Sequence, residues 1–76
     1  MTLLNNLKPT RVISAFERAG WCVVRQTGSH RILHKEGVPA ILSIPVHKGK
    51  PIKQGLLRKL ISHAELTVEE FLRLYK

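Results

Sequence analysis

The step from Gly28 through Ser29 to His30 contains the residue types best suited to chemistry in this chain. An unperturbed imidazole titrates near pH ~6.5, so a histidine can take up and return a proton at neutral pH. On RNA, proton exchange suffices without a metal: a base removes the proton of a ribose 2′-hydroxyl, the oxygen attacks the adjacent phosphate, and an acid protonates the leaving 5′-oxygen. Ser29 could bind the phosphate or orient the imidazole. We therefore interpret His30 as a candidate general base or acid.

Positive side chains could stabilise the charge that builds on the phosphate in such a reaction. The candidates are Arg25, Arg31, Lys48 and Lys50. Lys48, Lys50 and Lys53 flank Gly49 where a second helix is expected to begin, and the N–H groups of a helix start add donors for an anion. A solvated charge explains each lysine alone better than a phosphate contact does, whereas the group of three around Gly49 favours a phosphate site.

The other histidines, and His30 itself, leave alternatives open. His47 begins a short basic loop, His47-Lys48-Gly49-Lys50-Pro51. It could approach His30 if the first and third strands flank the second, which would pair an acid with a base; the alternative is a solvated loop residue. His34 stands two residues beyond His30 and projects from the same sheet face. His63 compensates a helix dipole or is solvated. For His30, the alternative is a partly buried strand residue with a satisfied hydrogen bond.

Residue counts exclude several other kinds of site. The chain contains no aspartate, which excludes a Ser-His-Asp triad, and its scattered glutamates offer no convergent cluster for Mg²⁺. The single Cys22 excludes an intrachain disulfide, and the histidines lack a thiol pair with zinc-finger spacing. We therefore expect neither a metal nor a cofactor.

Length and charge indicate one small domain over residues 1–76 with a polyanionic partner. Thirteen Lys and Arg against five acidic residues give a formal net charge of +8, and 43% hydrophobic residues suffice for a core. Nucleic acid is the first expectation, acidic protein the second and anionic lipid the third. No apolar run approaches the ~20 residues of a membrane span, the N-terminus lacks signal-peptide features, and a lone thiol suits a reducing compartment, so we expect a cytoplasmic protein.

The first elements that must position these residues are a helix and a strand. Residues 1–8 are expected to form a loose N-terminal arm, in which Leu3, Leu4 and Leu7 could pack as one short turn that no residue caps. Thr10 is a candidate N-cap, and the apolar residues after it recur at helical spacing until Gly20, where a helix commonly stops in a left-handed turn. A strand is predicted over Trp21–Gln26.

Two further strands and two helices complete the order. Turn residues separate strands predicted over His30–Lys35 and Ala40–Val46, and Pro45 suggests an edge position or a strand end. A second helix is predicted over Lys53–Ala64. Thr67 and Glu70 fit a capping box that begins a short last helix. The pattern predicts an α+β domain in which a three-stranded antiparallel sheet packs on helices.

The chain also resembles the HicA family, the small mRNA-cleaving toxins of HicA/HicB toxin–antitoxin pairs. The residues that carry the resemblance are, in chain order, Ala19-Gly20-Trp21, Val23-Val24-Arg25-Gln26, Gly28-Ser29-His30, Ile44-Pro45, His47-Lys48-Gly49-Lys50, Gly55-Leu56-Leu57-Arg58, Leu66-Thr67 and Glu69-Glu70-Phe71. They extend over about residues 10 to 75. The resemblance implies a double-stranded-RNA-binding-domain-like fold, α-β-β-β-α, here with a short extra C-terminal helix.

The resemblance also implies an activity and a partner. The activity is metal-independent and ribosome-independent cleavage of mRNA, with the catalytic histidine at His30. Family members often carry a second histidine directly after it; Arg31 stands there in this chain, which puts in doubt any mechanism that uses adjacent histidines. A HicB-like antitoxin would cover the active face, and the pair would bind promoter DNA only through the antitoxin. We expect the RNA-binding residues to be Arg25, Gly28, Ser29, Arg31, His47, Lys48 and Lys50.

Two other functions fit the same composition. A non-catalytic RNA-binding module needs only the charge and the fold, and it would retard RNA in a salt-dependent way without shortening it. A protein-interaction subunit would use its basic face to bind an acidic partner.

Overall fold

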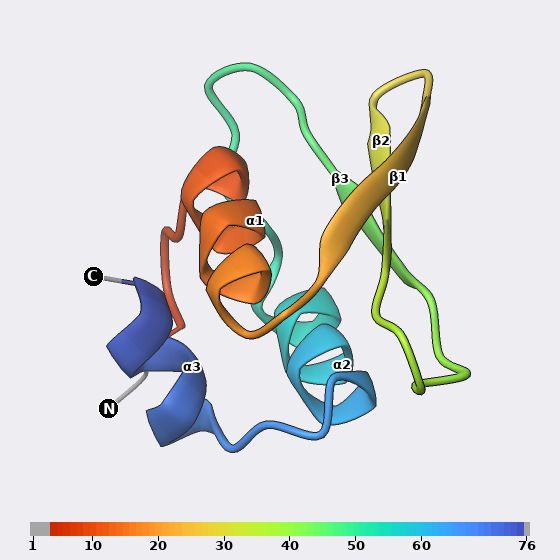
Figure 1. Ribbon diagram of the computed structural model, residues 1–76. Coiled ribbons are helices and arrows are strands. Elements are labelled where there is room, and N and C mark those ends of the chain that lie inside the picture. The colour runs from red at the N-terminus through yellow and green to blue at the C-terminus, as the bar shows by residue number, and fades with distance from the viewer. Residues whose placement is uncertain (1–3, 76) are drawn as a thin grey trace.

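The chain forms three helices and three strands between residues 4 and 75, the part that the computed structural model describes. The elements are α1 (Pro9–Arg18), β1 (Cys22–Thr27), β2 (His30–His34), β3 (Leu42–Pro45), α2 (Gln54–His63) and α3 (Val68–Tyr75) (Figure 1). The strands pair antiparallel in the order β1-β2-β3. This confirms the predicted α+β architecture, a double-stranded-RNA-binding-domain-like arrangement with an extra C-terminal helix.

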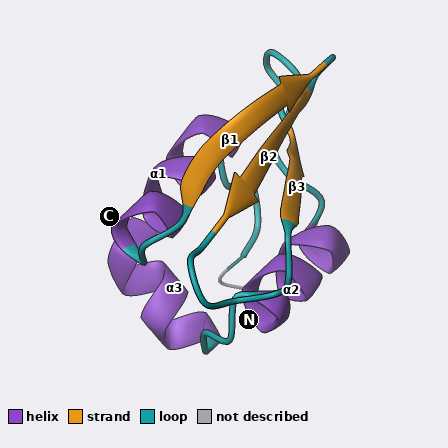
Figure 2. Ribbon diagram, turned by 45° about the vertical axis from the view of Figure 1, so that its right-hand side comes forward, coloured by secondary structure: helices purple, strands orange, loops and turns teal. Residues whose placement is uncertain are grey.

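The two faces of the sheet differ because neighbouring residues of a strand point to opposite sides. Leu33 of β2 pairs with Leu42 of β3, and both are fully buried, as is Ile44 of the same strand. Cross-strand partners share a face, so this side of the sheet packs on the helices. Figure 2 shows the helices gathered behind the sheet. The opposite side, which we call the open face, has no element of the described chain packed on it.

The core joins this apolar side of the sheet to one face of each helix. The helices contribute residues at the spacing predicted from the sequence, and Trp21 fills the space before β1. The helical residues that are buried are Pro9, Val12, Ile13, Ala15 and Phe16 of α1, Leu57, Leu60 and Ile61 of α2, and Phe71 of α3. Burial of apolar side chains, from the helices, the sheet and the loops together, is the dominant favourable contribution to the free energy of folding.

The start of α1 differs from the sequence prediction. The helix begins at Pro9, its N-cap is Lys8, and the Lys8 side chain makes no capping hydrogen bond. The prediction of Thr10 as the N-cap was therefore wrong. Proline is favoured at the first helical position because its fixed φ suits the helix and its missing N–H would have no partner there.

The predicted loose arm is also wrong for the residues that the structure describes. Residues 1–3 lie outside the described chain. Leu4 is fully buried, Leu7 is 9% exposed, and the Leu7 carbonyl accepts a hydrogen bond of 3.1 Å from the Ile52 N–H. Burial of the two apolar side chains is favourable by more free energy than the conformational entropy that a free segment would keep. Residues 4–8 therefore pack against the fold.

The turn after α1 agrees with the sequence prediction. Gly20 has φ +102°, in the left-handed region that favours glycine, and the Trp21 N–H donates to the Phe16 carbonyl at 3.1 Å. The Lys35 ammonium donates to the Ala19 carbonyl at 2.8 Å, and its Cε lies 3.0 Å from the position that a Cβ on Gly20 would take. This contact fixes the entry from α1 into β1.

The capping box of α3 is confirmed and predicts an acid-dependent stability. The Thr67 N–H donates to the Glu70 carboxylate at 2.8 Å, and the Glu70 N–H donates to the Thr67 hydroxyl at 3.1 Å. Hydrogen bonds from Thr67, chiefly from its backbone, lower the pKa of the Glu70 carboxyl below its ordinary 4.5.

Glu70→Gln is therefore expected to flatten the loss of stability in acid. A carboxyl with a lowered pKa stabilises the fold fully above its pKa in the unfolded chain, and this contribution is lost as pH falls through the pKa in the folded protein. The natural protein should lose stability more steeply below about pH 4.5 than the variant does, in urea unfolding measured from pH 7 to pH 3. Parallel curves over that range would contradict the prediction.

Candidate functional site

His30 lies on the open face of the sheet. Its cross-strand partners are Thr27 of β1 on one side and Pro45 of β3 on the other, and its side chain is exposed. His34 lies on the same face at the far end of β2, as predicted from its spacing. The imidazole of His30 is therefore accessible to a large ligand rather than buried beneath the helices.

The turn before His30 is joined to the chain after β3. The Val46 N–H donates to the Ser29 carbonyl at 2.7 Å, which extends the pairing of β2 and β3 by one step. Gly28 takes φ +58° in the tight turn, and the Gln26 side chain donates to its carbonyl at 3.4 Å. The Gly28-Ser29-His30 step is thus held at a defined position beside the chain that leads to His47.

His47 and His30 lie at the same end of the sheet. The first and third strands do flank the second, which was the condition for their approach. Pro45 is the partner of His30, and His47 follows it by two residues, exposed at the start of the basic loop. The structure therefore places the two histidines at the same end of the sheet, one on a strand and one on a loop.

The two arginines next to this site lie on opposite faces. Arg25 pairs with Ile32, which shares the open face with His30, whereas Arg31 pairs with the buried Ile44 and is half-buried. Adjacent residues of a strand cannot share a face, so the register separates Arg31 from the His30 side chain. Arg25 remains on the same surface as His30.

A bulge in β1 places Arg25 there. Val23 pairs with the buried Leu33, and the next paired residue is Arg25, so Val24 has no partner in the register. One extra residue reverses the alternation of the strand from that point on. Without the bulge, Arg25 would point toward the helices. The sequence motif contains this residue, but nothing in its spacing shows the irregularity.

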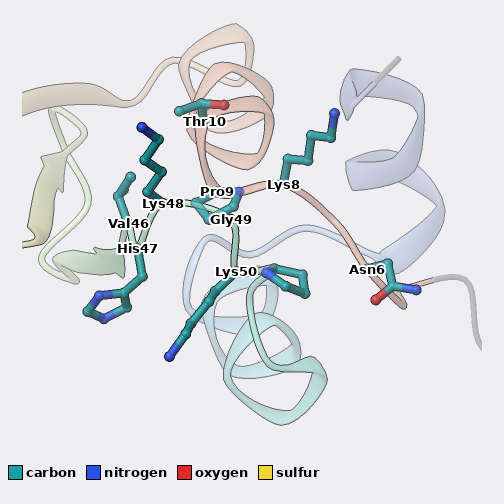
Figure 3. Close-up of a pocket in the computed structure, with 10 residues that line it drawn as sticks. Asn6, Lys8, Pro9, Thr10, Val46, His47, Lys48, Gly49 and Lys50 are labelled. Atoms are coloured by element: carbon teal, nitrogen blue, oxygen red, sulfur yellow. The ribbon is translucent and has the colours of Figure 1, made fainter.

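The basic loop after β3 lies between two hollows, which we name by the helix whose start they adjoin. The α1 hollow, about 510 Å³, is lined by Asn6, Lys8, Pro9, Thr10, Val46, His47, Lys48, Gly49, Lys50 and Pro51. The α2 hollow, about 320 Å³, is lined by Pro45, His47, Lys50, Pro51, Ile52, Lys53 and Leu56. No residue of either lining is acidic. Figure 3 shows Lys48 extending toward the start of α1, while His47 and Lys50 extend to the other side of the loop.

The α2 hollow adjoins His30 through Pro45. It gathers His47, Lys50 and Lys53, and the two lysines belong to the group for which the sequence predicts a phosphate site at the helix start. Lys48 lines the α1 hollow instead, together with Lys8 and Thr10, which sequence reasoning missed. Lys8 lies about forty residues before the loop in the chain, and only tertiary packing brings the two segments together.

The described residues show neither a cluster of metal ligands nor a membrane-spanning helix. Within residues 4–75, no three His, Cys, Asp or Glu side chains come together as ligands for a metal ion. None of the helices in that range is long and apolar enough to cross a membrane.

Comparison with known proteins identifies one family. A family model described as the HicA toxin of bacterial toxin-antitoxin matches residues 10–66. This stretch contains α1 from its second residue, the whole sheet and α2, and therefore every residue of the open face, whereas α3 lies beyond it. No curated protein matches the chain.

Proposed function

Because the chain belongs to the HicA family of toxins from bacterial toxin–antitoxin systems, we propose that it is an endoribonuclease that cleaves cytoplasmic mRNA with His30 as general base or acid. The observation that carries this proposal is the exposed position of His30 on the open face, beside a basic loop with a second histidine. An RNA strand can reach this imidazole, and cations are available to hold its phosphate.

The proposed reaction is a transfer within the RNA itself. A base takes the proton of the ribose 2′-hydroxyl, O2′ forms a bond to the adjacent phosphorus, and the bond from phosphorus to O5′ breaks. An acid gives a proton to the leaving O5′, so that the products are a 2′,3′-cyclic phosphate and a free 5′-hydroxyl. His30 serves one of these two roles, and His47, at the same end of the sheet, is the candidate for the other.

Cations around His30 would stabilise the transition state. Arg25 shares the open face, and Lys50 lines the hollow that begins at Pro45. Preorganised positive charge at the point where negative charge builds often accelerates such reactions more than any other single effect. Gly28 and Ser29 allow the backbone to approach the phosphate closely. Arg31, on the other face, is proposed to contribute only through its charge at the margin of the site.

The test is cleavage of a 5′-labelled RNA by the pure protein in excess EDTA. We expect shortened products that end in a 2′,3′-cyclic phosphate, formed at the same rate with and without the chelator, because the proposed chemistry needs only side chains. RNA that is retarded but stays intact would instead support a non-catalytic binding module. Products with 3′-hydroxyl ends, or loss of activity in EDTA, would contradict the mechanism.

A toxin of this family has an antitoxin partner, and we propose that a HicB-like chain covers the open face. The net charge of +8 favours an acidic partner by electrostatic attraction. Contact with promoter DNA would then come through the antitoxin. Protection of His30 and Arg25 on binding, followed by hydrogen exchange or chemical footprinting, would support this arrangement.

A further inference from the structure

Both helices that border the basic loop have a lysine at the N-cap position. Lys8 is the N-cap of α1 and Lys53 is the N-cap of α2; neither side chain makes a capping hydrogen bond, and neither helix has an acid in its first turn. Asn, Asp, Ser and Thr are the residues that stabilise this position. A cation near the positive end of a helix dipole is unfavourable. Each of the two helix starts beside this loop is therefore less stable than it would be with a capping residue.

An anion at these helix starts would reverse the penalty. The first N–H groups of a helix have no partner within the helix, and phosphate is a suitable acceptor for them. Lys53 adjoins the hollow beside His30, where the proposed function already places the scissile phosphate. The start of α1 adjoins the other hollow, to which no role has been assigned.

The α1 hollow has the lining expected of a phosphate site. Lys8 and Lys48 supply positive charge from two separate segments, and Asn6 and Thr10 add polar side chains. Lys48 extends beside Thr10 in Figure 3, whereas Lys8 extends on the other side of Pro9. Positive charge therefore lies on both sides of the helix start, and no lining residue is acidic.

We propose that the α1 hollow binds a second phosphate of the RNA strand, on a nucleotide beyond the bond that is cleaved. The inference rests on the proposed function and extends it along the substrate. His30 pairs with Pro45, and Lys48 follows Pro45 by three residues. The backbone from Pro45 to Lys48 therefore spans at most about 11 Å. The two hollows also share His47, Lys50 and Pro51. One strand can thus run from the open face across the loop into this hollow.

The two phosphate sites would divide the work of binding. The site near His30 holds the reacting phosphate, and the α1 hollow fixes the strand at a second point, which lowers its freedom to shift along the protein. Such a contact strengthens binding without taking part in proton transfer. Its loss should weaken RNA binding and raise KM more than it lowers kcat.

The test measures RNA binding with the His30→Ala protein, so that the strand stays intact. Lys48→Gln in this background should weaken the binding of a single-stranded RNA by roughly tenfold and lower the slope of log K against log salt by about 0.7, the value for one phosphate contact. The matched control is Lys59→Gln, which removes the same charge from an exposed position on α2 that lines neither hollow. It should change the affinity less than twofold.

Lys8→Asp gives a result that simple damage to the fold would not produce. Aspartate is a favourable N-cap, so the variant should raise Tm by on the order of 4 °C while it weakens RNA binding. Inorganic phosphate should raise the Tm of the natural protein more than sodium chloride of equal ionic strength does, and Lys48→Gln should reduce this difference.

Unchanged RNA affinity in both Lys48→Gln and Lys8→Asp would overturn the proposal. If the same variants bind RNA normally but bind the antitoxin more weakly, the hollow is a protein-docking surface and the proposal is equally overturned. Failure of the nuclease proposal gives a different pattern: no cleavage by the natural protein, with the effect of Lys48→Gln on RNA binding retained. Cleavage that depends on His30 together with unchanged binding in Lys48→Gln removes the second phosphate site alone.

Discussion

Replacing His30 by alanine is expected to lower the rate of RNA cleavage by about 10²–10⁴-fold, the usual contribution of a general acid or base. His30 is exposed and lies outside the core, and its place in the register between β1 and β3 is a property of the backbone. Its removal should therefore change the free energy of unfolding by no more than about 0.5 kcal/mol. Single-turnover cleavage at saturating protein measures the first quantity, and urea unfolding measures the second. Growth after induction of each protein gives the corresponding toxicity.

His34→Ala is the matched control for this loss. His34 is exposed on the same face of the same strand, but it pairs with Cys22 at the other end of the sheet, away from the basic loop. We expect its cleavage rate to stay within a few-fold of that of the natural protein. Equal toxicity and equal cleavage from the natural protein and His30→Ala would remove His30 from the mechanism, and an equal loss in both variants would point to general damage to the open face.

The placement of His30 could be predicted from local sequence because two short-range signals agree. Turn residues stand before it, and Leu33 and the residues around it alternate as a half-buried strand does. The same kind of pattern predicts a strand over residues 40–46, which contains β3, and Pro45, interpreted as an edge position or a strand end, is the last residue of that strand. These features depend on residues a few positions apart, for which one sequence carries enough information.

The placement of the arginines could not be predicted in this way. The bulge at Val24 changes the face of Arg25 without any glycine or proline to mark it. Strict alternation along the strand places Arg25 with the core, and the sequence motif places Arg31 beside His30 although it faces the helices. Register in a sheet is decided by the burial of the whole strand, which a motif of three residues does not contain.

The α1 hollow was missed for a different reason. Its lining comes from residues 6–10 and 46–51, two segments joined by a hydrogen bond from Ile52 to Leu7 and by the burial of Leu4 and Leu7. The sequence suggested a loose arm because no cap was visible before Thr10. Lys8 is an unfavourable N-cap for α1. A prediction based on helix stability alone therefore chooses Thr10, a better capping residue, as the helix start. Departures of this kind from local preference are found at functional sites.

The helix beyond the family match leads to the second large prediction, the loss of stability in Phe71→Ala. Phe71 of α3 is fully buried. The centroid of its ring lies 5.1 Å from the ring centroid of Phe16 and 6.1 Å from that of Tyr75. Truncation of a buried phenylalanine costs about 3–5 kcal/mol, against about 5–15 kcal/mol for the stability of a whole domain. Urea unfolding should show a much lower midpoint, and Leu72→Ala, at a half-buried neighbouring position, should lose less.

The loss should extend from α3 to the start of α1, because the two are tied together at several points. The Tyr75 hydroxyl accepts a hydrogen bond of 3.0 Å from the Lys8 N–H. The Arg11 guanidinium lies 4.5 Å from the centre of the Tyr75 ring and donates to the Tyr75 carbonyl at 3.2 Å. Hydrogen exchange in Phe71→Ala should therefore rise in the first turn of α1 as well as in α3, while β2 and β3 stay protected until global unfolding. Faster exchange confined to α3 would show that this helix packs on the fold without supporting the start of α1. A loss of stability below about 1 kcal/mol would contradict its place in the core, since a buried ring cannot be removed at so small a cost.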